Sequence, residues 1–467
     1  MQIPILNGVY TAESADYKTQ YPVNMLPVIQ DTGISKGYLR PVEGIEELGE
    51  GPGVSRGAIN WNNEHYRVMG SILCRIDKNG IVTEIGDVGN NSKRVSMDYS
   101  FDLLAIASDE RLFYYDGDIL LEATDPDFGV VLDVVWVDGY FLTTDGEYIV
   151  ATEITDPTST LPTRYTSSEY DPDPIVSILK LRNEIHAINR YTIEVFRNVG
   201  GTEFPFQRVN GAQIQRGALG THCSVVYEEA IAFLGSGRGE APAVYLGASG
   251  QTQKISTREI DEILEEYTEE ELALSVLETL NDKSQAFLWV RLKDKTLVYD
   301  LTASRVVGEP VWHIMRSGVS KLGPYRARDV IYCFDSWQVG DTNSAKVGIL
   351  NKNISTHFGD KSRWEFQTKI IYNEARGVIL KKLELIALTG RTVGFEEPYI
   401  STAYSLDGRV WSQEKYIKTG IHGDRLKRLV WWNRNIMRRE RVQRFRGDSD
   451  SYIAVSRLEA DLEPLGV

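Results

Sequence analysis

The sequence contains few cysteines and no long apolar run. Its three cysteines, Cys74, Cys223 and Cys333, are odd in number and far apart, so they match neither a disulfide framework nor a zinc spacing. No stretch approaches the ~20 apolar residues that span a bilayer. The start, MQIPILNGVYTAES, lacks the basic and apolar regions of a signal peptide. We therefore expect a chain made in the reducing cytoplasm, without a membrane-spanning segment and with its cysteines buried.

The sequence also lacks the motifs of common catalytic sites. It has no Gly-x-Ser-x-Gly elbow and no phosphate-cradling loop ahead of a helix. The glycine-rich GSGRGEAP at 235–242 lies inside a hairpin pattern, which favours a turn. Acid pairs such as Asp171 and Asp173 carry little weight among 66 acids. No paired metal-site spacing occurs among the histidines, which are His65, His186, His222, His313, His357 and His422. We predict no enzymatic activity, no metal and no cofactor.

The composition favours strands and tight turns. Of the 467 residues, 42% are hydrophobic and 25% charged, as in an ordinary globular protein, and the chain contains 24 Tyr, 9 Trp and 40 Gly. Aromatic residues are enriched in strands and glycine in turns. The length predicts two or three domains, or one large repetitive β architecture.

A hairpin pattern recurs between residues 66 and 300. An apolar strand, a polar turn and a second apolar strand are repeated six times, as in YRVMGSILCRIDKNG and LLAIASDERLFYYDG. Equivalent positions in the second strands are 36 to 54 residues apart, and they are Leu73, Leu112, Tyr148, Ile193, Val244 and Val298. This interval matches a four-stranded propeller blade. We predict a mainly β fold with a six-bladed β-propeller over 56–350, with a pair of β-sandwiches as the alternative.

Two segments depart from the hairpin pattern. Residues 256–282 are rich in helix formers, and Thr268 with Glu271 has capping-box spacing, which predicts a short helical insertion between the fifth and sixth blades. Residues 351–467 alternate like the strands of a β-sandwich-like domain. That domain includes SLDGRVW (405–411), which is similar to an Asp-box hairpin, a structural turn without catalytic meaning.

Positive charge is concentrated near the C-terminus of an otherwise acidic chain. Residues 425–446 hold nine Lys or Arg and one acid, Glu440, whereas the whole chain carries −15, so the remainder sums to −23. Two interpretations stay open: solvated arginines paired with neighbouring acids, or a contact surface for an acidic partner or a polyphosphate. Trp and Arg are enriched at binding hot spots. The candidate interface residues are Arg425, Lys427, Arg428, Trp431, Trp432, Arg434, Arg438, Arg439, Arg441 and Arg444.

A series of short motifs runs along almost the whole chain. In order they are PVNML and GYLR within residues 21–45, GVSRG at 53–57, IGDVGNNSKRVSMDYS, YTEEELALSVLETL and the basic KRLVW. This series resembles the packaged-DNA stabilisation proteins of short-tailed bacteriophages, also described as tail-hub or nozzle proteins. The resemblance implies a structural virion protein of the phage tail, assembled in the host cytoplasm.

The resemblance also implies partners. Such proteins form a six-fold ring, a hexamer, below the portal and its adaptor ring, and they extend the channel for double-stranded DNA. They stabilise packaged DNA and conduct it during ejection, while a tail needle plugs the opening and tailspikes attach at the side. The basic stretch is then expected to meet an acidic protein surface, with DNA contact as the second interpretation. A propeller-type glycan-binding or glycan-hydrolysing protein is the alternative of another class.

The N-terminal segment, residues 1–55, has two interpretations. The turn-rich residues Gly37, Tyr38, Leu39, Arg40 and Pro41 form a candidate assembly arm that reaches a neighbouring subunit. Alternatively, the segment supplies a strand that completes the last propeller blade.

Overall fold

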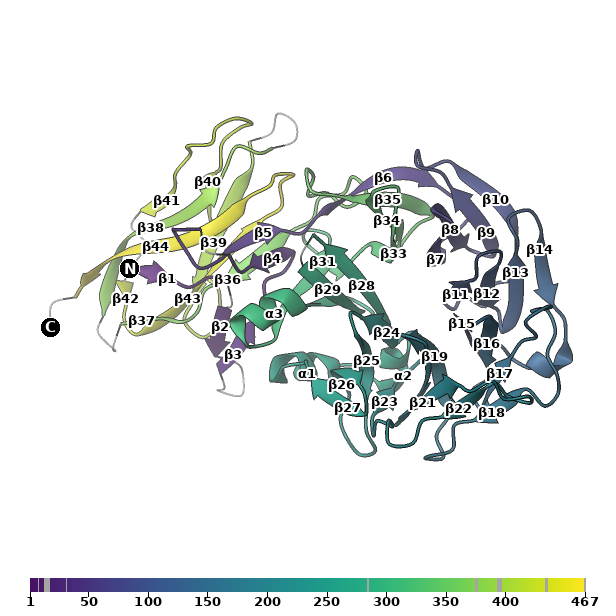
Figure 1. Cartoon of the computed structure of the whole chain (residues 1–467). Helices are drawn as coiled ribbons and strands as arrows, with labels where there is room; N and C mark the ends of the chain where they lie inside the picture. Colours follow the sequence, from purple (N-terminus) through teal and green to yellow (C-terminus); the bar gives the residue numbers. More distant parts are fainter. Residues whose placement is uncertain are drawn as a thin grey trace. The chain divides into compact units, whose positions relative to one another are not determined.

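The computed structural model describes residues 1–6, 8–11, 17–30, 32–283, 285–373, 377–392, 397–432 and 436–465. Contacts divide the chain into two compact units. The propeller unit comprises Leu48–Lys293 and Ala327–Ile349. The sandwich unit comprises Met1–Glu47, Asp294–Arg326 and Leu350–Val467. Figure 1 labels the elements of both.

The first four sheets each contain four antiparallel strands in chain order. Sheet 1 contains β7 (Ser55–Trp61), β8 (Glu64–Met69), β9 (Ile72–Ile76) and β10 (Val82–Asp87). Sheet 2 contains β11 (Ser96–Tyr99), β12 (Leu104–Ser108), β13 (Arg111–Tyr115) and β14 (Leu120–Ala123). Sheet 3 contains β15 (Asp133–Val137), β16 (Tyr140–Thr144), β17 (Tyr148–Ala151) and β18 (Tyr165–Ser167). Sheet 4 contains β19 (Ile175–Leu181), β20 (Glu184–Asn189), β21 (Ile193–Asn198) and β22 (Phe206–Arg208).

Three further sheets continue the series. Sheet 5 contains β23 (Gly217–Ala218), β24 (Ser224–Tyr227), β25 (Ala230–Ser236), β26 (Ala243–Ala248) and β27 (Gln251–Lys254). Sheet 6 contains β28 (Val276–Asp282), β29 (Gln285–Arg291), β30 (Thr296–Asp300), β31 (Val311–Ser317) and β32 (Gly323–Pro324). Sheet 7 contains β33 (Ala327–Cys333), β34 (Ser336–Asp341), β35 (Lys346–Asn351) and the N-terminal strand β6 (Gly44–Glu50).

One strand of each sheet lies in a closed ring, and it is the first strand in chain order except in sheet 5, where β24 follows the two-residue strand β23, and in sheet 7, where β33 follows the N-terminal strand β6. The ring runs in the order β7, β11, β15, β19, β24, β28 and β33. Each of these strands contacts the next, and β33 contacts β7. This is a β-propeller, and the described residues form seven blades in it. The predicted number of six blades is therefore wrong. The strands β34 and β35 were missed, although Val347 follows Val298 by 49 residues, within the spacing of the other hairpins.

Tight turns and apolar strand faces explain why these residues form blades. Asn62 and Asn63, and likewise Asp109 and Glu110, have positive φ at both turn positions, the geometry that joins two antiparallel strands by two residues. Neighbouring blades bury their facing side chains against each other. Between blades 1 and 2 the core includes Trp61, Tyr66, Val68, Leu73, Val95, Leu104, Ile106, Phe113 and Tyr115. The turn residues and the apolar pattern together therefore determine each hairpin.

The helical segment is shorter than predicted. It contains α1 (Arg258–Leu264) and α2 (Glu269–Ala273), and the predicted capping box between Thr268 and Glu271 is confirmed. Residues 276–282 form strand β28 instead of helix, so Leu277 packs in a sheet, whereas Leu274 is exposed. The other helical elements are α3 (Leu301–Val307) and the short 3-10 helix η1 (Pro126–Phe128).

Besides strands β30, β31 and β32 of sheet 6, the sandwich unit contains two sheets around one apolar core. The first has the order β4 (Met25–Val28), β5 (Tyr38–Pro41), β44 (Ala454–Pro464), β38 (Val378–Leu388) and β41 (Leu429–Trp432). In this sheet β1 (Gln2–Ile3) also pairs with β44, and β42 (Ile436–Met437) with β38. The second has the order β36 (Trp364–Gln367), β43 (Glu440–Gly447), β39 (Tyr399–Ser405) and β40 (Lys415–Lys418), and β37 (Ile371–Tyr372) pairs with β43. A separate hairpin joins β2 (Gly8–Thr11) and β3 (Tyr17–Gln20).

The candidate assembly arm is part of this sandwich. Gly37 precedes strand β5, and Tyr38, Leu39, Arg40 and Pro41 form it, paired with β4 and at Leu39 with β44. Leu39 is fully buried in the core. The backbone of Tyr38–Pro41 and the side chain of Leu39 are therefore engaged within their own unit. Strand β6, which follows them, is the fourth strand of blade 7.

The described residues contain no helix that is long and apolar enough to cross a membrane. All three cysteines are buried and free, as the sequence predicts.

Candidate functional site

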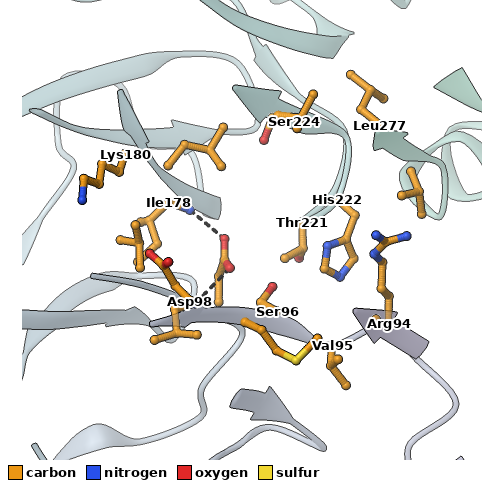
Figure 2. A pocket seen from close by; sticks show the side chains of 18 of the residues that line it. Arg94, Val95, Ser96, Asp98, Ile178, Lys180, Thr221, His222, Ser224 and Leu277 are labelled. Atoms are coloured by element: carbon orange, nitrogen blue, oxygen red, sulfur yellow. Dashed lines mark hydrogen bonds between the residues drawn. The ribbon is translucent and has the colours of Figure 1, made fainter. Parts of the chain in front are cut away.

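The propeller surrounds a central cavity of about 400 Å³. Its wall comes from the first strands of six blades and from the residues just before them. Figure 2 shows Asp98 on one side of this cavity, and Thr221 and His222 with Arg94 across it. No Phe, Tyr or Trp lies among the described residues of the wall.

Two acids of the cavity wall join neighbouring blades. Asp98 on β11 accepts hydrogen bonds from the backbone N–H of Trp136 on β15 (2.7 Å) and of Tyr99 (2.9 Å). Asp133 on β15 accepts from the backbone N–H of Ile178 on β19 (2.9 Å) and of Val134 (2.9 Å). Burial raises the pKa of both carboxyl groups, that of Asp133 to about 7. Each acid therefore accepts a hydrogen bond from a backbone N–H of the next blade, and together the two acids link blades 2, 3 and 4.

The opposite wall carries a cation and a neutral imidazole. Arg94, just before β11, donates to Glu278 Oε1 from Nη2 at 3.1 Å and pairs with Asp329 Oδ1 through Nη1 at 2.7 Å. Burial, and next the charge of Arg94, lowers the pKa of His222 to about 3. His222 is therefore neutral at physiological pH and is not poised for proton transfer.

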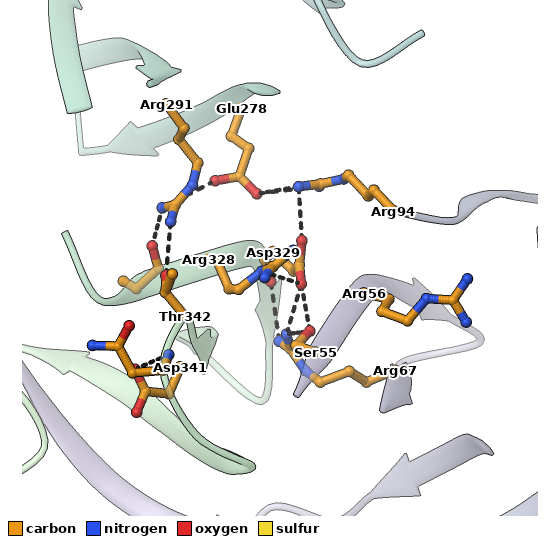
Figure 3. A network of polar contacts seen from close by, with 12 residues as sticks. Ser55, Arg56, Arg67, Arg94, Glu278, Arg291, Arg328, Asp329, Asp341 and Thr342 are labelled. Atoms are coloured by element: carbon orange, nitrogen blue, oxygen red, sulfur yellow. Dashed lines mark hydrogen bonds and ion pairs between the residues drawn. The ribbon is translucent and has the colours of Figure 1, made fainter. Parts of the chain in front are cut away.

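Buried charges connect blades 1, 6 and 7 beside this wall (Figure 3). Asp329 on β33 faces Arg67 on β8, and neither side chain is exposed to solvent. Arg67 donates to Ser55 Oγ at 2.7 Å and to the Asp329 carbonyl at 3.0 Å, and Ser55 donates to the Asp329 carboxylate. Burial opposes ionisation of Asp329, but Arg94, Arg328 and Arg67 outweigh it and hold its pKa below the ordinary value.

A second carboxylate extends this closure cluster, which we define as Arg67, Arg94, Glu278, Arg291, Arg328 and Asp329. Glu278 on β28 lies 3.8 Å from Arg291 on β29, in addition to its contact with Arg94. Arg291 also donates to the carbonyl of Ala327 at the start of β33. The closure cluster therefore ties the last blades to the first at the point where the ring closes.

The chemistry of these groups is structural. No group of three or more His, Cys, Asp and Glu side chains in the described part of the chain could hold a metal ion. The cavity acids are held by backbone amides, and the aromatic platform that a sugar site uses is absent from the described wall. The alternative of a glycan-binding or glycan-hydrolysing propeller therefore gains no support.

The basic stretch divides into buried and exposed parts. Trp431, Arg441 and Arg444 are buried within the sandwich unit. Arg441 lies over the ring of Tyr404 (4.5 Å) and Arg444 over that of Trp411 (4.0 Å). Because these three are buried within their own unit, they are not part of its exposed surface. Arg434 lies outside the described residues.

The remaining candidates are exposed and form what we call the basic surface. It consists of Arg425, Leu426, Lys427, Arg428, Trp432, Arg438 and Arg439. On strand β41, Trp431 is buried and Trp432 points outward, with 65% of its surface exposed. Arg428 pairs with Glu384 on β38 through two contacts of 2.7 and 2.8 Å, an internal contact within the unit.

Several important residues were not found from the sequence. Leu426 is 93% exposed between two cations, which is unusual for leucine and could have been noticed once its loop position was known. Asp133 and Asp329 have no distinguishing motif or spacing in the sequence, which contains 66 acids. The SLDGRVW turn was correctly interpreted: Asp407 accepts from the amides of Arg409 and Val410, both at 2.9 Å.

Comparison with known proteins matches both parts of the chain. The family described as bacteriophage P22 Gp10, beta-propeller, matches residues 1–355, and that described as bacteriophage P22 Gp10, beta-sandwich, matches residues 363–463. The tail hub protein gp10 of Salmonella phage P22 is 30% identical over 452 residues, which cover 92% of each chain.

Solved structures with similar folds are more distant. They include a streptogramin B lyase (11% identity, 66% of this chain and 97% of that one, TM-score 0.42). They also include the WD40 domain of Neurospora crassa Pan2 (8% identity, 66% of this chain and 95% of that one, TM-score 0.42). These scores are too low to support an argument about function. The two family matches span nearly all of the chain, and they agree with the predicted propeller, sandwich and lack of enzymatic activity. The chain therefore belongs to the bacteriophage P22 Gp10 family.

Proposed function

We propose that this chain is a structural tail hub protein of a short-tailed phage virion. The observation that carries the proposal is the match to the tail hub protein of phage P22 along 92% of both chains. The site chemistry agrees with it, because the buried polar groups of the propeller hold blades together. The chain therefore acts through assembly in the tail.

In this role, copies of the chain form a ring, six in number by the family resemblance, that extends the portal channel. The ring meets the portal adaptor above, the tail needle at its opening and the tailspikes at its side. It retains packaged DNA and conducts it during ejection. The net charge of −15 supports this role, because an acidic protein on average repels a duplex and does not bind it.

A phage that lacks this gene provides the direct test. Filled heads should form normally and then lose their DNA during purification, and added protein should restore both DNA retention and infectivity. The measurement is the fraction of heads that still contain DNA. If heads remain full without the protein, it is not needed to retain the packaged DNA.

A further inference from the structure

The basic surface combines cations with exposed apolar side chains. Five exposed cations, Arg425, Lys427, Arg428, Arg438 and Arg439, accompany Leu426 and Trp432. The surface follows the β41–β42 edge of the first sandwich sheet. Leu429 pairs with Leu385 and Met437 with Val378 on β38, so the edge extends over about 23 Å at ~3.3 Å per residue. It is large enough to contact a protein partner.

This combination fits an acidic protein surface better than DNA. A duplex would leave Leu426 and Trp432 without an apolar partner, since protein–DNA interfaces are polar and strongly charged. Trp and Arg are the residues that contribute most to protein–protein binding. The partner should therefore present both carboxylates and apolar side chains.

One segment of the chain itself exposes side chains of both kinds. Residues 258–274, which contain α1 and α2, hold eight acids and one cation, Arg258. Asp261, Glu269 and Glu271 pair with cations of their own unit. Glu265 and Glu270 are exposed, and Leu274 is 79% exposed just after α2. We call Glu265, Glu270 and Leu274 the acidic surface.

We propose that the basic surface of one copy of this chain binds the acidic surface of a second copy. Two different patches then meet, so the contact is heterologous, and repeated contacts of this type close into a ring when the rotation allows it. The charges of the two surfaces are opposite, and each offers an exposed leucine. The inference rests on the proposed ring and names the contact that forms it.

Charge exchange tests the contact directly. In the full-length protein, Arg438→Glu with Arg439→Glu should raise the dissociation constant of the oligomer at least tenfold, as should Glu265→Lys with Glu270→Lys. Combining all four substitutions should restore assembly, because opposite charges again face each other. Sedimentation velocity at several protein concentrations measures the change. Lys78→Glu with Lys93→Glu, which reverses exposed cations of the propeller unit, should leave assembly unchanged.

Leu426→Asp adds a test that does not depend on removing charge. It should weaken assembly at any salt concentration, whereas the charge variants should have a smaller effect on assembly as salt rises.

The proposal would be overturned if assembly survives either pair of charge substitutions, or if combining all four substitutions fails to restore it. Binding of free duplex that the basic-surface variants abolish, with assembly unaffected, would assign the surface to DNA. Unaltered protein that oligomerises but fails to restore DNA retention would contradict the hub role alone.

Discussion

Arg67 and Asp329 form an ion pair in which neither side chain is exposed, with 3.9 Å between Arg67 Nη1 and Asp329 Oδ2. The two residues are 262 positions apart in the sequence and belong to the first and last blades. Their pairing therefore links the two ends of the propeller. Burial lowers the pKa of Arg67 to about 10, which leaves it charged at neutral pH.

Removing the charge of Asp329 should destabilise the propeller strongly. In Asp329→Asn, Arg67 and Arg94 lose their shared carboxylate, and breaking a buried pair costs about 3–5 kcal/mol. The φ of 52° at this position suits asparagine, so the variant tests the charge and not the backbone. The free energy of unfolding in urea measures the effect. Asp335→Asn, at an exposed position with φ of 56° in the same hairpin, is the matched control and should change little.

Asp133 should make the propeller less stable as pH rises through the weakly acidic range. Its folded pKa of about 7 lies above the ordinary 3.8, so between these values the folded state binds more protons than the unfolded state. The free energy of unfolding then falls by at most about 1.4 kcal/mol per pH unit, and this slope ends above pH 7. Urea unfolding of the unaltered chain and of Asp133→Asn at pH 5 and pH 8 measures it. The Asn variant should lose less stability over this interval; equal losses would show that Asp133 is ionised in both states.

Gly49 in the closing strand β6 should not tolerate a side chain. A Cβ there would lie 2.1 Å from the carbonyl oxygen of Gly80, a backbone atom in the turn between β9 and β10. Gly49→Ala should therefore shift the strand and cost about 1–3 kcal/mol. Thermal unfolding measures the loss. Gly323→Ala is the control, since a Cβ at Gly323 meets nothing within 4 Å and its φ is not positive.

Arg428 should determine the pKa of Glu384. The hydrogen bond from Arg428 is the main reason that this pKa is lowered to about 2, and Lys382 contributes further. Arg428→Ala should raise the pKa towards 4.5, as carboxyl NMR shifts during titration would show. Because the folded pKa lies below the ordinary value, the stabilisation is present above about pH 4.5 and is lost as pH falls towards 2. An unchanged pKa would mean that Lys382 alone holds the carboxylate.

Local sequence patterns predicted the hairpins but not the long-range pairings. Leu112 and Ile193 stand in apolar strands beside polar turns, and such signals require only neighbouring residues. Blade 7 lacks this contrast: Gly340 and Gly348 interrupt the apolar runs of β34 and β35, and the fourth strand comes from residues 44–50. No local pattern beside blade 7 indicates a strand supplied from the other end of the chain, and the sequence offered this strand only as one of two interpretations of residues 1–55.

The candidate interface was predicted only in part for a similar reason. Charge density identified the basic stretch, but it could not separate Arg441, which lies over Tyr404, from exposed Arg438. That distinction depends on which strands pair, since β43 bearing Arg441 lies beside β39 bearing Tyr404. Arginine is usually exposed, so its burial here required the structure.

Blade 7 also sets the order of events during synthesis. Strand β6 leaves the ribosome early, but its partner β35 is made about 300 residues later, which takes roughly 15–60 s at ~5–20 residues per second. Strand β5, which pairs with β4 on one side, receives its second partner later still, because β44 contains residues 454–464. Throughout this interval the N-terminal strands present unpaired edges while polysomes hold many nascent chains close together. Early association between chains is therefore a hazard that the cell's chaperones must limit.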